Sequence, residues 1–171
     1  MLFRSYRMIY SKNTFNKKKL LSGFKKGLIM KLLNPYLNFS GKTEEAFNFY
    51  KSVFGVDFVG DIMRFKDFPD SENLPAHEKN QVLHCAIPLG QNLLMASDAP
   101  ESMGFKVTFG NNFHLYIEAD DKAEADHLFS ALSEGGQIIG AMQDMFWGAY
   151  FGSLCDKFGM QWMISYTYPQ E

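Results

Sequence analysis

The first half of the chain begins with a pattern typical of a strand, followed by one typical of a helix. Alternation over 32–39 is typical of a half-buried strand. Apolar side chains then recur every three or four residues, which indicates an amphipathic helix that opens at 40–43 and ends at Gly55. We expect its buried side to be Ala46, Phe49, Tyr50 and Val53. The strands expected after it are 56–63, 81–88 and 92–97, with a polar loop over 65–80.

The second half of the chain repeats this order of elements. Residues 34–37 align with 114–117, and Gly55 aligns with Gly135. The helix expected at 121–134 has its buried side at Ala125, Leu128, Phe129 and Leu132. The strands expected around it are 113–118, 137–144, 147–154 and 160–168. The order βαβββ thus occurs twice, which predicts an α+β fold of two modules and not a doubly wound parallel sheet.

Composition limits the class of protein without naming its function. The chain has 171 residues, of which 46% are hydrophobic and 21% charged, enough for one core or two small modules and too apolar for a disordered chain. No apolar run reaches the roughly 18 residues that cross a bilayer. Cys85 and Cys155 lack metal-binding or redox spacing, so we expect reduced thiols and a cytoplasmic location. Asp98 and Asp156 lie at predicted turns, where carboxylates accept local backbone hydrogen bonds.

Basic residues are concentrated at the N-terminus. Residues 1–29 carry eight Lys and Arg and no acid, whereas 30–171 carry nine basic and nineteen acidic residues. The segment could be a basic arm for nucleic acid, a targeting peptide, or an extension ahead of an alternative start at Met30. We favour the extension, because an acidic body argues against nucleic acid as the main partner. We therefore expect one domain over 30–171, with modules at about 30–100 and 110–171.

Several motifs within 30–169 resemble a known family. They are Asn-Pro-Tyr-Leu-Asn-Phe at 34–39, Val-Leu-His-Cys-Ala-Ile at 82–87, Met-Phe-Trp-Gly-Ala-Tyr-Phe-Gly at 145–152 and Asp-Lys-Phe-Gly-Met-Gln-Trp-Met-Ile at 156–164. Together they resemble the PhnB-like branch of the glyoxalase/bleomycin resistance/dioxygenase superfamily, also called the vicinal oxygen chelate superfamily. The resemblance implies two βαβββ modules that form curved sheets around a cavity, and a homodimer. It implies no single activity, because relatives include metal-dependent enzymes and metal-free drug-binding proteins.

The resemblance also implies where a divalent metal would bind. Matching the ligand-bearing strand positions of metal-using relatives gives Asn34, His84, His114 and Met163. Only His84 and His114 are good ligands, since an amide binds weakly and a thioether is too soft for a hard centre. Glu118 lies near the rim as a third donor. We assign no cofactor, and keep as the alternative function a divalent-metal-dependent lyase or dioxygenase that uses His84 and His114.

The preferred function is small-molecule binding in an apolar cavity with a few polar groups. The predicted lining is Tyr36, Asn38, His84, Met95, His114, Trp147 and Phe151. The two histidines could instead be structural, and the aromatic residues could fill a core. Whether the protein is an enzyme stays open.

A methyltransferase label carried by some PhnB-like relatives finds no support in the sequence. A nucleotide-binding glycine loop follows a strand and opens a helix. The glycine-rich stretch at 134–140 instead follows a predicted helix, where glycine is expected as a C-terminal cap. No nucleophile elbow or zinc-type cysteine pair is present in the sequence.

Overall fold

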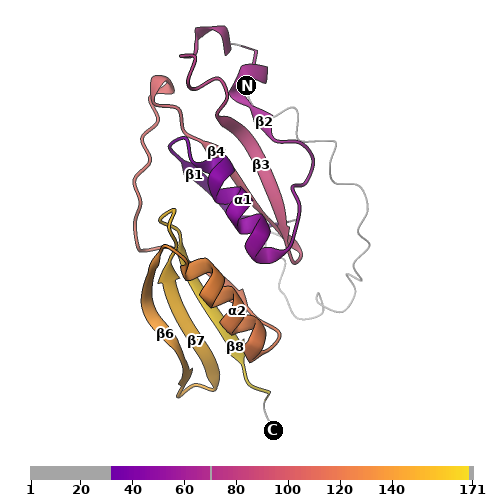
Figure 1. The fold of residues 1–171 in the computed structure, drawn as a ribbon, viewed down its shortest axis with the longest axis vertical. Coiled ribbons are helices and arrows are strands. Elements are labelled where there is room, and N and C mark those ends of the chain that lie inside the picture. Colours follow the sequence, from indigo (N-terminus) through magenta and orange to yellow (C-terminus); the bar gives the residue numbers. More distant parts are fainter. Residues whose placement is uncertain (1–31, 70, 170–171) are drawn as a thin grey trace, which may run out of the picture. The chain divides into compact units, whose positions relative to one another are not determined.

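The first βαβββ module is present in the order that the sequence predicts. A computed structural model describes residues 32–69 and 71–169, so the predictions for 1–29 lie outside the described residues. The elements of this module are β1 (Tyr36–Phe39), α1 (Thr43–Phe54), β2 (Met63–Arg64), β3 (Val82–Leu89) and β4 (Asn92–Asp98) (Figure 1). Short 3₁₀ turns occur at Phe65–Asp67, Ser71–Asn73 and Glu101–Met103. The sheet order is β1-β4-β3-β2, with β1 parallel to β4 and the other pairs antiparallel.

The second module has the same topology. Its elements are β5 (Leu115–Glu118), α2 (Lys122–Ser133), β6 (Gln137–Met145), β7 (Ala149–Cys155) and β8 (Gln161–Thr167). The sheet order is β5-β8-β7-β6, and again the first strand runs parallel to the last. The predicted α+β fold of two βαβββ modules is therefore confirmed, with two mixed four-stranded sheets.

Both helices begin and end close to the predicted residues. In α2, all four predicted inward residues are buried. In α1, Ala46, Tyr50 and Val53 are buried as predicted, but Phe49 is only half-buried and Phe47 is fully buried instead. Phe49 packs against the ring of Phe158 at 5.7 Å between centroids, so it covers the edge of the core and not its centre.

The predicted strand at 56–63 is wrong over most of its length, since only Met63 belongs to a ladder there. Gly60 adopts a positive φ of 75°, and a residue in the left-handed region breaks the regular pleat of a strand. Val59 N still donates one hydrogen bond of 2.8 Å to Ala86 O. This segment therefore runs beside β3 without pairing along it.

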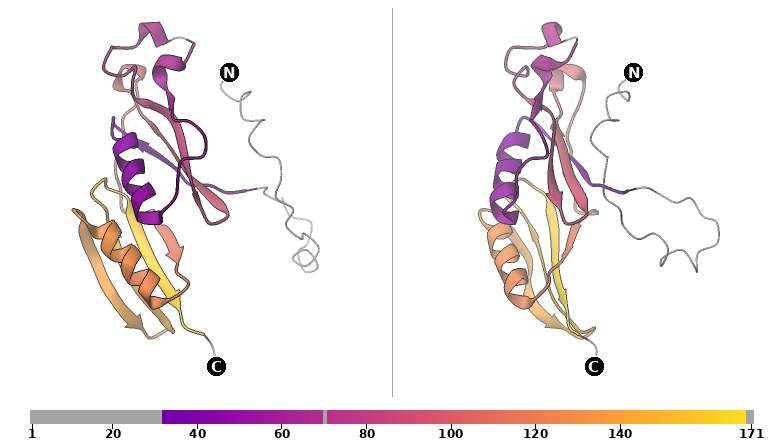
Figure 2. Two further views of the ribbon diagram at one scale, coloured as in Figure 1. Left: turned by 45° about the vertical axis from the view of Figure 1, so that its right-hand side comes forward. Right: turned by 90° about the vertical axis from the view of Figure 1, so that its right-hand side faces the viewer.

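Each sheet has one face against its helix and one face turned away from it, which we call the open face (Figure 2). Leu37 and Phe39 of β1 are buried on the helix side, whereas Tyr36 and Asn38 of the same strand are exposed on the open face. Because side chains alternate along a strand, the same division continues across β4 and β3. The predicted lining residues Tyr36 and Asn38 lie on the open face of the first sheet.

Candidate functional site

Tyr36 and His84 form the centre of the polar cluster on the open face of the first sheet. Tyr36 Oη and His84 Nδ1 are joined by a 3.3 Å hydrogen bond, and the two rings stack with centroids 5.8 Å apart. Burial lowers the pKa of His84, so its imidazole is neutral near pH 7. Two residues that are 48 positions apart in the chain thus make one hydrogen-bonding and aromatic unit.

Two more predicted residues lie beside this pair. Met95 is the cross-strand partner of Tyr36 in the parallel β1–β4 ladder. Asn38 is the partner of Ser97, whose hydroxyl donates a 3.2 Å hydrogen bond to Asn38 Oδ1. The structure therefore brings together Tyr36, Asn38, His84 and Met95 in the first module.

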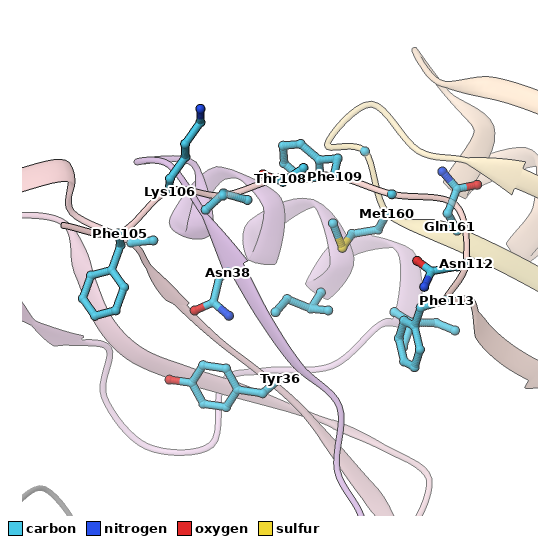
Figure 3. A pocket seen from close by; sticks show the side chains of 16 residues that line it. Tyr36, Asn38, Phe105, Lys106, Thr108, Phe109, Asn112, Phe113, Met160 and Gln161 are labelled. Carbon is cyan, nitrogen blue, oxygen red and sulfur yellow. The ribbon is translucent and has the colours of Figure 1, made fainter. Parts of the chain in front are cut away.

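A cavity of about 540 Å³ lies over β1 (Figure 3). Tyr36 and Asn38 contribute from β1, and Met160 and Gln161 contribute from the start of β8. Most of the remaining wall comes from the segment 105–113, with Phe105, Phe109 and Phe113, and the rest comes from Leu37, Ala99, Leu115 and Gly159. Aromatic rings, a thioether and side-chain amides thus surround a volume suited to a small organic molecule.

Sequence reasoning missed the wall formed by 105–113. Its signal was the recurrence of phenylalanine every fourth residue, from the gap between the two predicted modules into the start of the predicted strand 113–118. Phe105, Phe109 and Phe113 are each more than half exposed, which is unusual for three large apolar side chains in one short segment. Exposed aromatic residues in a loop are typical of ligand-binding surfaces.

The other predicted lining residues belong to the second module. His114 is half-buried just before β5, and Phe151 is half-buried in β7. Trp147 lies in the turn between β6 and β7 and not in the predicted strand, because Gly148 with φ of 84° closes that turn. Its ring contacts Phe146 and Phe151. Among the described residues, the cavity wall includes none of His84, Met95, His114, Trp147 and Phe151.

The donor set does not fit a metal centre within the described part of the chain. No three His, Cys, Asp or Glu side chains of residues 32–69 and 71–169 are grouped to hold an ion. The amide oxygen of Asn34 accepts a 3.0 Å hydrogen bond from Leu93 N, which makes Asn34 a support for β4. We therefore derive no chemical step through a metal.

Neither cysteine is placed as a nucleophile. Burial raises the pKa of the Cys85 thiol to about 12, and burial also raises the pKa of Cys155. A thiol at neutral pH is a poor nucleophile because the thiolate is the reactive form. Covalent catalysis through cysteine is thus disfavoured.

The sequence matches the family model described as 3-demethylubiquinone-9 3-methyltransferase over residues 31–165. The chain belongs to this family. Protein YjdN of Escherichia coli strain K12 is 30% identical, with 81% of this chain and 97% of that protein covered. These matches, together with a PhnB protein from Bacillus cereus that is 29% identical, confirm the resemblance to PhnB-like proteins.

Solved structures share the fold of this chain. Protein PA1353 from Pseudomonas aeruginosa has a TM-score of 0.69 at 33% identity, covering 79% of this chain and 96% of its own. The PhnB protein from Bacillus cereus is described as a putative 3-demethylubiquinone-9 3-methyltransferase. It has a TM-score of 0.65 at 29% identity, and the match covers 79% of this chain and 98% of that protein. A glyoxalase/bleomycin resistance protein/dioxygenase family enzyme from Burkholderia phytofirmans PsJN, at 20% identity, 78% and 97% coverage and a TM-score of 0.55, shares the fold.

The glycine-rich stretch after α2 is a helix end, as predicted. Gly135 has a φ of 70°, and a Cβ on Gly136 would lie 2.3 Å from Cys155 O. The two glycines therefore allow the chain to leave α2 and pass close to β7 before β6 begins. This geometry offers no strand–loop–helix cradle for a nucleotide.

Among the helices of residues 32–69 and 71–169, none has the length and apolar character of a membrane-spanning helix.

Proposed function

We propose that this chain is a PhnB-like small-molecule-binding protein whose ligand occupies the cavity over β1. The observation that carries the proposal is the position of Tyr36. Its side chain lines the cavity, and its hydroxyl is hydrogen-bonded to His84 on the same open face. A ligand in the cavity would thus contact a ring whose orientation is already fixed, which lowers the entropic cost of binding.

The described lining favours an uncharged, partly aromatic ligand. Its polar side chains include the amides of Asn38, Asn112 and Gln161, which both donate and accept hydrogen bonds. Lys106 is the one charged side chain among the described lining residues, and its ammonium group points away from Tyr36 and Asn38 (Figure 3). A charged ligand would lose its hydration without gaining an opposite charge in return.

Two finer features belong to the same proposal. A homodimer is supported by the large side chains that the open faces leave exposed, among them Tyr36, Met63 and Tyr116. A cytoplasmic location is supported by two cysteines that are both free thiols. Size measurement at several protein concentrations tests the first feature, and localisation of the tagged full chain tests the second.

The binding proposal is tested with benzamide, a neutral aromatic amide, and benzoate, its charged counterpart. Titration of the full chain followed by ¹H–¹⁵N NMR should show saturable shifts for benzamide at the amides of 105–113, and weaker binding of benzoate. Replacing Tyr36 with Ala should weaken benzamide binding by about 1 kcal/mol or more, roughly fivefold in Kd.

The control variant is Phe146→Ala, because Phe146 is 97% exposed and is not among the described cavity residues. This substitution removes an aromatic side chain of similar size without touching the cavity, so benzamide affinity should not change. Equal affinities for wild type and Tyr36→Ala, or shifts confined to residues outside the cavity, would show that the cavity is not the binding site.

A further inference from the structure

The open faces of the two modules carry matching rows of side chains. In the first module, the β1–β4 ladder pairs Tyr36 with Met95 and Asn38 with Ser97. In the second module, the β5–β8 ladder pairs Tyr116 with Met163 and Glu118 with Ser165. Each open face thus presents a Tyr–Met pair beside a pair made of a polar residue and a serine. The polar residue is Asn38 in the first module and Glu118 in the second, so a carboxylate replaces an amide.

Two hydrogen bonds fix this carboxylate in place. Glu118 Oε1 accepts a 2.7 Å hydrogen bond from Thr167 N on β8, and Oε2 accepts a hydrogen bond from Tyr116 Oη. Burial alone raises the pKa of Glu118, but the hydrogen bonds from Thr167 and Tyr116 outweigh it and lower the pKa. Glu118 is therefore an ordered anion at neutral pH with lone pairs to spare.

Glu118 differs from the acidic residues that form ion pairs. Glu44 pairs with Arg64 at 2.8 Å, and Asp144 pairs with Lys122 at 3.0 Å. Within the described part of the chain, no Lys, Arg or His lies within ion-pair distance of Glu118. The charge that would balance this ordered carboxylate is thus not supplied by those residues.

Aromatic side chains border the carboxylate on the same face. Tyr116 is 58% exposed. Phe151 is half-buried in β7 and is the cross-strand partner of Ser165, so it continues the row that starts at Glu118. Rings beside a carboxylate favour an organic cation, since the π faces attract positive charge and the carboxylate accepts its N–H groups.

We propose that the open face of the second module binds the primary ammonium group of a small amine. Glu118 is the hydrogen-bond acceptor and counter-charge, and Tyr116 and Phe151 border the carbon skeleton. This site is separate from the cavity over β1, whose described wall does not include Glu118. The two proposals can therefore fail independently.

The test uses the full chain with benzylamine and its neutral counterpart, benzyl alcohol. In ¹H–¹⁵N NMR titrations, benzylamine should give saturable shifts that are largest at the backbone amides of Glu118, Phe151 and Thr167, whereas benzyl alcohol should leave them in place. Glu118→Gln keeps an oxygen acceptor for Thr167 N but removes the charge, and should raise the Kd for benzylamine at least fivefold. Glu72→Gln, a neutralised exposed carboxylate in another part of the fold, should bind as wild type does.

Two results would overturn the proposal. One is a wild-type titration in which benzylamine shifts residues elsewhere, or shifts none. The other is unchanged affinity in Glu118→Gln. Should that variant not fold, as judged by circular dichroism, the wild-type shift map still decides. Loss of benzamide binding in Tyr36→Ala, with benzylamine binding retained, would show that the two sites are distinct.

Discussion

Tyr50 Oη donates a 2.7 Å hydrogen bond to Asp156 Oδ2, and both side chains are buried. The bond joins α1 of the first module to the β7–β8 turn of the second. The same oxygen accepts a 2.8 Å hydrogen bond from the indole of Trp162, and Oδ1 accepts from the amides of Phe158 and Met160. A buried carboxylate with four donors is satisfied, so the two modules share one polar anchor within an apolar core.

Removing the Tyr50 hydroxyl should therefore destabilise the whole fold. Tyr50→Phe leaves the ring packing but takes one donor from Asp156, which should lower the free energy of unfolding by about 1–3 kcal/mol. Urea unfolding followed by circular dichroism measures the change. Tyr150→Phe is the matched control, because the Tyr150 hydroxyl bonds to Asp126 at an exposed position. Its effect should stay within about 0.5 kcal/mol, and equal losses in the two variants would contradict the anchor.

Gly159 should tolerate alanine poorly, because it is constrained twice. Its φ of 87° disfavours any side chain, and an added Cβ would lie 3.0 Å from the ring of Phe109 in the cavity wall. Gly104 has a similar φ of 81° but nothing within 4 Å of the added Cβ. Both alanine variants should lose about 1 kcal/mol or more from backbone strain, but only Gly159→Ala should also move Phe109.

The NMR signals of 105–113 and the affinity for benzamide separate the two effects. In Gly159→Ala, both should change, because the ring of Phe109 borders the cavity. In Gly104→Ala, the benzamide affinity should stay at the wild-type value. If the two variants perturb Phe109 equally, the contact between Phe109 and Gly159 does not shape the cavity wall.

Stability should fall on mild acidification because of His84. Burial lowers the pKa of His84 in the folded state below its ordinary value of 6.5, so the unfolded chain takes up this proton more readily. The contribution of neutral His84 to the free energy of unfolding is complete above the pKa of this histidine in the unfolded chain, about 6.5. It is lost as the pH falls from there through the pKa of His84 in the folded chain. Urea unfolding at pH 7.5 and at pH 5 should show that the free energy of unfolding falls more between these two pH values in wild type than in His84→Gln.

His77→Gln provides the control for this pH effect, because the side chain of His77 is 78% exposed. It should show the same pH dependence as wild type. An NMR titration of the His84 ring should independently give a pKa below 6.5. A ring that titrates at or above 6.5 would contradict the assignment of a neutral imidazole beside Tyr36.

Local spacing in the sequence is enough to predict most of the helices and strands. Both helices, the β3–β4 hairpin and the repeated βαβββ order follow from the spacing of apolar residues and from glycine at helix ends, which act within a few residues. Alternation also placed Tyr36 and Asn38 on one face of the first strand, where both side chains are exposed. It failed at 56–62, where hydrophobic residues pack beside β3 without forming a ladder.

Contacts between distant residues depend on how the whole chain packs. The backbone hydrogen bonds of Asp156 follow from its place in a turn, but its bond to Tyr50 spans 106 positions of the chain. Asp98, predicted to bond locally, instead accepts from Thr43 and Val82 on other elements. Tyr36 reaches His84, and Glu118 reaches Thr167, through strand pairing alone. Strand register fixes such contacts, and register is set by the packing of whole sheets rather than by the residues that come into contact.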